Sequence, residues 1–567
     1  MDSSKEFEPE PGTHQENVLK EQSSFEQDNH VDRVPTVPLY EDGKVNLIPM
    51  PTDDPNDPLN LPKWRTWAAI GSICLFGAMA AAAELILGAM LPVFVIQYSP
   101  IGQYPPSYKI LQHIHLPEDV NSLRALEDLN QNAGPPIWKT FLLASLPILM
   151  IGLSNFLFVP LAITFGRRPV VLVSGIIAIG GAVWAGHSTS LDSHLGARAI
   201  QAIGAGTVES LIPFIISDMV FLHQRNKAIS LVFGIQGLLI VILGIATPWI
   251  IIRVNWNWIY FITAIAAGVF WIACFFFMPE TRYYRTDNEM KGISRHHLLP
   301  GQSRPPIDLT EHAPRSWKRD LMPWGGPIHF RRGLMAFVHT LQTFFYPHIF
   351  FVTLLNSATI AATLAAGYTV SPQLLAEPWA WPFEHLGFLL FAVLISAIAV
   401  FLISGLLADS LANLIAKRRG RRDPEIQALN LIPPTVISLI GTILFGLAGD
   451  EPGKYGWPTF LVGLGFISYG FLATNSIGVV YVLECYPHMS GPALVNIGSF
   501  RSIIAFLIVF DVPEWIASMG YLRTFGIYMG LLGGFILFIP IIFMFGEGWR
   551  KRWPGPTERV DVNVVKE

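Results

Sequence analysis

The chain has 567 residues, of which 51% are hydrophobic and 14% are charged. Because soluble domains carry about 25% charged residues, this composition excludes an ordinary soluble protein. The formal net charge of −4 says little by itself, because charge is segregated along the chain, and we expect no nucleic-acid partner.

The chain begins with an acidic, polar tail. Its first 62 residues contain 14 Asp and Glu but only 4 Lys and Arg, with many Pro and Ser and no long apolar run. Such a segment cannot bury enough apolar surface to fold alone. We therefore predict that residues 1–65 form a disordered cytosolic tail. The tail also lacks the basic stretch and short apolar run of a cleavable signal peptide.

An apolar run of 33 residues follows, from Thr66 to Tyr98, and Glu84 is its one charged residue. At ~1.5 Å of rise per residue, this run is longer than the ~20 residues needed to cross a bilayer as a helix. Eleven more stretches predict further membrane helices: 138–161, 170–189, 195–220, 228–252, 257–278, 344–368, 385–407, 429–449, 457–485, 492–512 and 523–546.

The predicted helices divide into two sets of six. A mostly polar segment separates them, and the two halves, 66–278 and 334–546, are each 213 residues long. Equal halves suggest an internal duplication, as many transporter folds have. The predicted fold class is an all-α membrane protein, with twelve transmembrane helices in two six-helix bundles around a central cavity. Residues 279–333 form the central loop and residues 547–567 the C-terminal tail.

Lys and Arg are distributed unevenly between the two sides of the membrane. If the helices alternate in direction, 30 of the 38 Lys and Arg residues lie on the side of the N-terminal tail and 6 on the other side. Cytosolic loops carry the excess of positive charge. Both termini are therefore predicted to be cytosolic, and we expect a monomer in the plasma membrane.

Glu84 lies deep in the first apolar helix, past the middle if that helix begins near Ile70. A carboxylate in the hydrocarbon core costs ~2.5 kcal/mol or more on insertion scales, so it normally faces a cavity or a partner. We expect Glu84 to bind a proton or a substrate. A purely structural hydrogen bond between helices is the alternative.

The fourth helix carries further polar residues. At 100° per residue, the eleven-residue spacing of Arg198 and Glu209 places both on one stripe of a continuous helix. Polar side chains on the seventh and tenth helices are expected near the same depth. The candidate substrate- and proton-binding residues are Glu84, Arg198, Gln201, Glu209, Asn356 and Asn475. Hydrogen bonding between helices without any substrate remains the alternative.

Two loop motifs and one helix motif suggest a family. The turn after the second helix reads VPLAITFGRRPVVL, the eighth helix ends in GLLADSLANLIAKRRGRR, and Arg198 and Gln201 open the fourth helix with R-x-x-Q. These resemble the signatures of the major facilitator superfamily, although Ile163 replaces the Asp of the first motif. The leader DPLNLPKWR is similar to that of fungal drug and polyamine proton antiporters. The fifth helix departs from the antiporter pattern, which leaves the direction of transport open.

The resemblance implies a cytosolic lock that opens and closes during transport. Asp218 is nine residues beyond Glu209, on the opposite helix face, and we expect it to meet the Arg167–Arg168 turn. Glu484 is expected to pair with Arg501. The predicted lock residues are Gly166, Arg167, Arg168, Asp218, Asp409, Glu484 and Arg501. Static arginines that reach the lipid headgroups are the alternative.

The predicted function is secondary transport, with proton-coupled efflux of a small organic compound as the first choice. Uptake or exchange of polyamines or organic cations is the alternative. A membrane-embedded enzyme and a receptor are more distant ones. The chain has no His-Glu-x-x-His motif, and we expect neither a metal nor a cofactor.

Overall fold

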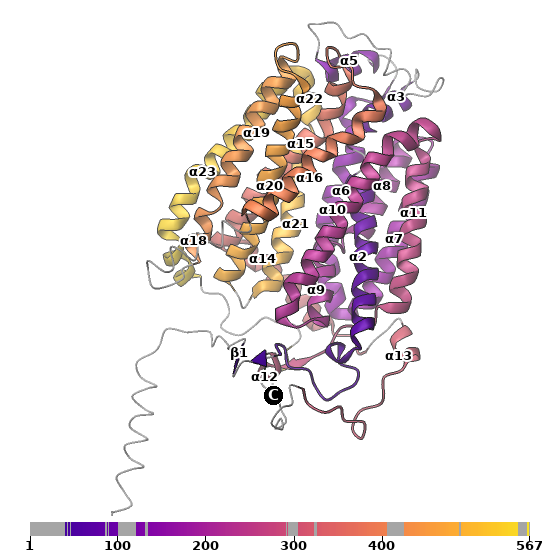
Figure 1. Cartoon of the computed structure of the whole chain (residues 1–567), viewed down its shortest axis with the longest axis vertical. Helices are drawn as coiled ribbons and strands as arrows, with labels where there is room; N and C mark the ends of the chain where they lie inside the picture. Colours follow the sequence, from indigo (N-terminus) through magenta and orange to yellow (C-terminus); the bar gives the residue numbers. More distant parts are fainter. Residues whose placement is uncertain are drawn as a thin grey trace, which may run out of the picture.

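The computed structural model shows two groups of long helices side by side (Figure 1). We call helices α2 to α11 the N-half and helices α15 to α23 the C-half. The described residues are 40–41, 44–45, 47–85, 88, 90–99, 121–130, 134–290, 292, 304–322, 326–404, 424–486, 489–553 and 564–565.

The N-half follows two short strands, β1 (Tyr40–Glu41) and β2 (Lys44–Val45), and the 3₁₀ turn η1 (Pro58–Asn60). Its helices are α2 (Lys63–Leu85), α3 (Leu91–Gln97), α5 (Ser122–Asn130), α6 (Ile137–Phe165), α7 (Arg167–His187), α8 (Leu191–Ala205), α9 (Leu211–Met219), α10 (Leu222–Arg253) and α11 (Asn257–Phe277).

The central segment contains β3 (Arg285–Thr286), α12 (Asp287–Met290), α13 (Trp317–Leu321) and α14 (Phe330–Phe344). The C-half consists of α15 (Pro347–Leu375), the 3₁₀ helix η3 (Phe383–Leu389), α16 (Leu390–Ala399), the π-helical turn η4 (Val400–Ser404), α18 (Glu425–Leu429), α19 (Ile432–Asp450), α20 (Trp457–Cys485), α21 (Ser490–Val509), α22 (Val512–Met519) and α23 (Tyr521–Arg552), before the strand β4 (Val564–Val565).

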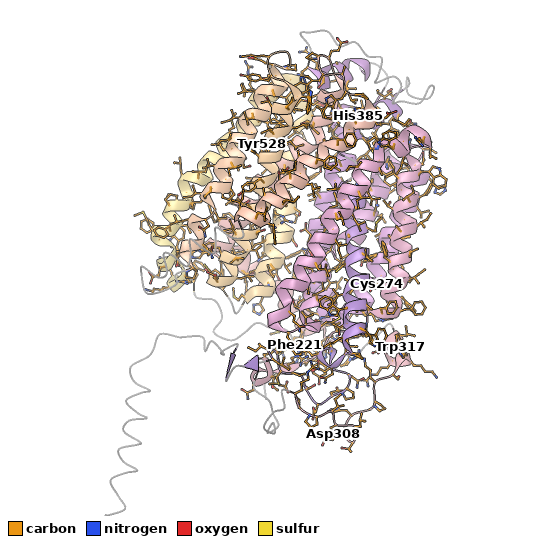
Figure 2. The ribbon with its side chains drawn as sticks, viewed as in Figure 1. Phe221, Cys274, Asp308, Trp317, His385 and Tyr528 are labelled. Atoms are coloured by element: carbon orange, nitrogen blue, oxygen red, sulfur yellow. The ribbon has the colours of Figure 1, made fainter. Side chains whose placement is uncertain are left out.

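The bundle has two distinct ends. Helices α12 and α13 lie at one end, which we call the linker end, and α5 and α22 lie at the other, which we call the loop end (Figure 1). Figure 2 shows Asp308 and Trp317 at the linker end and His385 toward the loop end. Hydrogen bonds join the two halves at the loop end, from Asn121 Nδ2 to the carbonyl of Ile516 at 2.8 Å and from Ser122 Oγ to Gln373 Oε1 at 2.7 Å.

Ten stretches among the described residues are long and apolar enough to cross a membrane. They match the second, third and fifth to twelfth predicted helices. Helix α2 and the pair α8 and α9 occupy the places of the first and fourth. The all-α fold expected from the apolar runs is therefore confirmed.

The described residues of the 33-residue apolar run form two helices. Helix α2 ends at Leu85 and α3 begins at Leu91. Pro92 stands in the first turn of α3. Proline has no N–H for an intrahelical bond but fits the first turn of a new helix, which explains the interruption.

The fourth predicted helix is broken by the turn 206–210. Gly206 packs against Ser154 and the backbone of Asn155 so closely that a Cβ would overlap the Ser154 hydroxyl. The N–H of Ile212 then donates to the carbonyl of Thr207, five residues back, at 3.1 Å. This wider spacing is a π-type turn, a deformation that is frequent at functional sites. The assumption of a continuous helix from 195 to 220 is therefore wrong.

A separate helix, α14, precedes the seventh membrane helix. The sequence places its first residues in the central loop and the remainder at the start of the C-half. With 15 residues, this helix is too short to be predicted as a membrane span. Apolar and polar residues alternate along it, so hydropathy alone does not reveal it.

The leader before α2 folds against the central segment. Asp57 is fully buried and accepts hydrogen bonds from Arg285 Nη1 at 2.8 Å, from the Leu59 N–H at 2.8 Å and from the Thr52 N–H at 2.9 Å. Such charge-assisted bonds are stronger than neutral ones. The DPLNLPKWR motif therefore anchors the start of the N-half to the segment that leaves it.

Close contact between α7 and α8 depends on small residues. A Cβ at Gly181 would lie 2.4 Å from the backbone nitrogen of Gln201, and one at Gly204 would lie 2.3 Å from that of Ala178. Gly180, one position away on α7, has nothing within 4 Å of its Cβ position. Helices in membranes associate through such small-residue contacts because lipid supplies no hydrophobic driving force between them.

We expect Gly181→Ala to destabilise the protein by roughly 1–3 kcal/mol, since overpacking pushes two helix backbones apart. Gly180→Ala is the matched control and should be neutral or slightly stabilising, because alanine favours helix and meets no neighbour. Thermal unfolding of the purified variants in detergent measures the difference. Equal melting temperatures for the two variants would contradict this packing.

Candidate functional site

A polar cluster joins the two halves between the linker end and the loop end of the bundle. Glu209 lies in the turn between α8 and α9, and its Oε1 is 2.8 Å from Nη2 of Arg501 on α21. Nη1 of Arg501 donates to Oδ1 of Asn475 on α20 at 2.8 Å. Nδ2 of Asn356 on α15 reaches the same oxygen at 3.4 Å. Three predicted site residues therefore meet around an arginine that we expected elsewhere.

A second tie lies beside this ion pair. Asn155 on α6 is fully buried, and its Nδ2 donates to Ser210 Oγ at 3.0 Å and to Ser499 Oγ at 2.9 Å. Ser210 adjoins Glu209, and Ser499 lies two residues before Arg501. The turn of the N-half and helix α21 of the C-half are thus held together by one charged and one neutral link.

Several polar atoms of the cluster have no hydrogen-bond partner among the residues that the structure describes. They are the acceptors Glu209 Oε2, Asn155 Oδ1 and Asn356 Oδ1, and the donor Arg501 Nε. Buried polar atoms are nearly always satisfied, so four orphans in one place require an explanation. The Glu209 side chain is 28% exposed and that of Arg501 only 9%. The arrangement can therefore accept a proton or an N–H or O–H group at the carboxylate.

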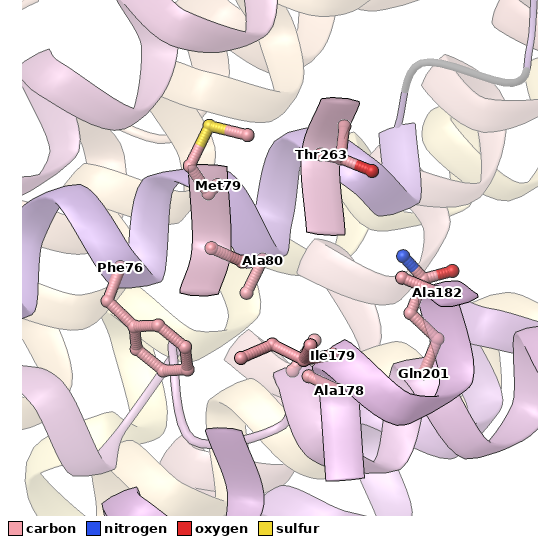
Figure 3. Close-up of a pocket in the computed structure, with 10 residues that line it drawn as sticks. Phe76, Met79, Ala80, Ala178, Ile179, Ala182, Gln201 and Thr263 are labelled. Carbon is pink, nitrogen blue, oxygen red and sulfur yellow. The ribbon is translucent and has the colours of Figure 1, made fainter. Parts of the chain in front are cut away.

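Arg198 and Gln201 lie outside this cluster. Arg198 is buried, and it donates from Nη1 to Gln201 Oε1 at 2.8 Å and from Nε to the carbonyl of Leu143 at 3.2 Å. The predicted stripe with Glu209 is wrong because the turn 206–210 interrupts the helix. Gln201 borders a cavity inside the N-half (Figure 3), whose volume of about 10 Å³ leaves room for no more than one water.

The turn between α6 and α7 has the predicted ion pair. Gly166 adopts φ +112°, a conformation that favours glycine, and lets the chain reverse direction there. Arg167 is fully buried, and its Nε lies 3.1 Å from Oδ2 of Asp218. The expected contact between Arg167 and Asp218 is present.

Arg168 and Glu280 complete this turn. Arg168 donates to the backbone carbonyls of Phe275 and Met278 at the end of α11. The carboxylate of Glu280 accepts the N–H groups of Arg167 at 3.0 Å and Arg168 at 3.2 Å, at the start of α7. A carboxylate is favourable at a helix N-terminus. Sequence reasoning missed Glu280, although its place directly after Pro279 marks it as the residue that follows a helix end.

Other residues predicted for the cytosolic lock do not lie at the turn between α6 and α7. Arg501 pairs with Glu209 and not with Glu484, so that prediction is wrong. Glu484 is nine residues beyond Asn475 on α20, which separates it by ~13 Å along the axis from the group that Arg501 contacts. Asp409 and the side chain of Glu84 lie outside the described residues.

The fold and the cluster together define a class of protein. Within the described residues, ten apolar spans in two halves that share a partly buried ion pair describe a polytopic membrane transporter. The proteins that the chain resembles are transporters rather than enzymes. The profile of the Major Facilitator Superfamily matches residues 73–509, and the chain belongs to that family. The family expected from the loop motifs is confirmed.

Several proteins are similar over most of the chain. An uncharacterized MFS-type transporter of Schizosaccharomyces pombe is 24% identical over 536 residues, covering 87% of this chain and 86% of its own. The efflux pump FUBT of Fusarium oxysporum is 22% identical over 472 residues, covering 81% and 68%. The xylose transporter XylE of E. coli, in a partially occluded inward open conformation, has a TM-score of 0.53 at 12% identity over 84% of this chain and 98% of its own.

We expect the single variants Arg167→Asp and Asp218→Arg to lose most activity, because each leaves a buried charge beside a like charge. The double variant exchanges the two charges and should recover a substantial part of it. Growth or transport in cells that express each variant, normalised to the amount at the membrane, measures the effect. A double variant as inactive as the singles would argue against a direct functional pair.

Proposed function

We propose that this transporter exports a small organic compound, a drug or secondary metabolite, in exchange for protons. The ion pair between Glu209 and Arg501 carries this proposal, since it joins the two halves and has one carboxylate oxygen without a hydrogen-bond partner in the described structure. The efflux pump among its relatives supports export. Coupling to a gradient would supply the energy for this movement.

The proposed coupling uses competition for Glu209. When a proton or a cationic group binds the carboxylate, the attraction to Arg501 weakens, and Arg501 keeps its bond to Asn475. The link between the halves is then reduced to neutral hydrogen bonds. Halves of transporters of this type rock against each other around a central site, and a ligand shifts that equilibrium by its differential affinity for the two states.

The remaining predicted residues keep their proposed roles. Glu84 is the second coupling carboxylate, and Asn356 and Asn475 are polar partners of the substrate. The contact of Arg167 with Asp218 belongs to the lock at the linker end. We place the linker end and both termini in the cytosol, because positive charge concentrates there, and the monomeric protein in the plasma membrane.

Uptake or exchange of polyamines or other organic cations is the second candidate function. Among the described residues, three acceptors around Glu209 lack a hydrogen-bond partner and one donor, Arg501 Nε, lacks one. This excess of acceptors favours a substrate that brings N–H donors. The guanidinium of Arg501 also lies over the ring of Phe471 at 5.7 Å, so the site already holds one cation beside an aromatic face.

Comparing small molecules by mass spectrometry in a deletion strain and an overexpressing strain tests the function. The intracellular concentration of compounds that the protein exports should be lower in the overexpressing strain than in the deletion strain. Glu209→Gln keeps the shape of the side chain but cannot ionise, and should lower export by roughly tenfold or more, since it leaves the buried Arg501 without its charged partner. Glu84→Gln should make export independent of external pH.

The control for these variants is Glu451→Gln, which removes an exposed carboxylate paired with Lys454 at the loop end. It should export normally. All variants must reach the membrane in equal amounts. Wild-type export and pH dependence in both Glu209→Gln and Glu84→Gln would rule out these carboxylates as the coupling groups.

The proposed orientation predicts a labelling pattern. A cysteine at the exposed Glu311, in the central segment, should react with an impermeant maleimide only in permeabilised cells. A cysteine at Glu451, whose side chain is 51% exposed at the loop end, should react in intact cells. The three native cysteines are buried and give little background. The reverse pattern would invert the topology.

A further inference from the structure

Helix α14 packs into the seam between the two halves near the linker end. Its buried residues are Gly333, Ala336, Thr340 and Thr343. Helices α6 of the N-half and α21 of the C-half are its main neighbours. A helix in this position can restrain the movement of one half against the other.

The first part of α14 is attached to the N-half. The His329 N–H, at its start, donates to the carbonyl of Thr164 at 3.2 Å. Gly333 packs directly on the Thr164 side chain, where any Cβ would overlap the hydroxyl. One turn further, the rings of Phe337 and Phe156 have centroids 4.8 Å apart.

The second part of α14 is attached to the C-half. Asn496 on α21 is fully buried, and its Nδ2 donates to the Thr340 carbonyl at 2.7 Å and to Thr343 Oγ1 at 2.6 Å. The rings of Phe344 and Phe500 have centroids 4.2 Å apart. Helix α14 is therefore a bridge with one end on each half.

The opposite face of α14 is apolar and exposed. Phe330 and Leu334 are each 66% exposed, and Val338, Leu341 and Phe345 continue the same stripe at spacings of three and four residues. On α6, the helix beside it, Leu153, Leu157 and Leu161 are exposed at the same spacing. Since α6 spans the membrane, the stripe of α14 continues a surface that faces lipid.

Positive charge gathers at the start of α14. Arg331 is exposed, and Arg332 stacks on the ring of Tyr284 at 4.4 Å. The Nη1 of Arg332 is buried and has no hydrogen-bond partner within the described part of the chain. Desolvation and the neighbouring Arg332 and Arg282 lower the pKa of His329, so the positive charge here comes chiefly from the arginines. Two guanidinium groups beside an apolar stripe match the phosphate and acyl chains of a phospholipid.

We propose that α14 is a membrane-embedded strap that binds an anionic phospholipid of the leaflet at the linker end. Arg331 and Arg332 bind the headgroup phosphate, and the acyl chains cover the stripe from Phe330 to Phe345. The lipid holds α14 against both halves. If the proposed transport function is correct, bound lipid also favours the conformation in which α14 bridges α6 and α21.

Fluorescence quenching tests where α14 lies. A bimane label on Leu334→Cys, in the full-length protein reconstituted into vesicles, should be quenched by lipids brominated on their acyl chains and not by aqueous iodide. A label on Glu311→Cys is the control and should show the opposite behaviour. Quenching of the Leu334 label by iodide alone would overturn the membrane position.

Thermal unfolding in nanodiscs tests the headgroup site. Phosphatidylserine mixed into phosphatidylcholine should raise the melting temperature of the wild type. The double variant Arg331→Gln/Arg332→Gln should lose that increase, and the control Lys318→Gln/Arg319→Gln, two exposed cations at the same end, should keep it. If the double variant fails to fold, Arg331→Gln alone should reduce the increase.

Two results would overturn the lipid site. One is an undiminished increase in the arginine variants. The other is an equal increase in phosphatidylcholine on addition of inorganic phosphate, which would assign the arginines to a free ion. Neither measurement uses transport, so failure of the proposed function leaves this test intact.

Discussion

The structure depends on a single constraint: a charge inside an apolar bundle must find a partner within the protein. An isolated charged side chain at membrane depth is costly, so each one specifies a contact. Arg198 is bound to Gln201 and to the Leu143 carbonyl within the N-half, and Arg168 to carbonyls at the end of α11. Contacts of this kind fasten helices of one half to each other and make that half a rigid body.

The contact of Glu209 with Arg501 differs in kind, because its two members belong to different halves. A charged pair between rigid bodies can be exchanged for another arrangement without disturbing either core. The Glu209 side chain is the more exposed member, and its Oε2 has no hydrogen-bond partner among the described residues. Charge is rare inside this bundle because each charged side chain needs a partner. The charged pair that can be rearranged therefore lies at the boundary between the halves.

The sequence predicts those parts of the structure that depend on local composition. Apolar length revealed the membrane helices, because crossing a bilayer requires a minimum number of residues. The expected contact of Asp218 with Arg167 is present, although the helical angle between Glu209 and Asp218 assumes a helix that the turn 206–210 interrupts. The break at 206–210 was not predictable, since it arises from the packing of Gly206 on Ser154, a contact distant in sequence. Without that break, neither the displacement of Glu209 from Arg198 nor its pairing with Arg501 follows.

The break at 206–210 also explains the position of the Glu209 carboxylate. In a continuous helix Glu209 would share a face with Arg198, but eleven residues of rise would keep the two charges ~16 Å apart along the axis. Arg198 is bound within the N-half by Gln201 and the Leu143 carbonyl, and the π-type turn leaves Glu209 beside Arg501 of the C-half. The carboxylate then lies just before the first residues of α9, where the backbone N–H groups favour negative charge. A local irregularity in one helix therefore places the carboxylate that links the two halves.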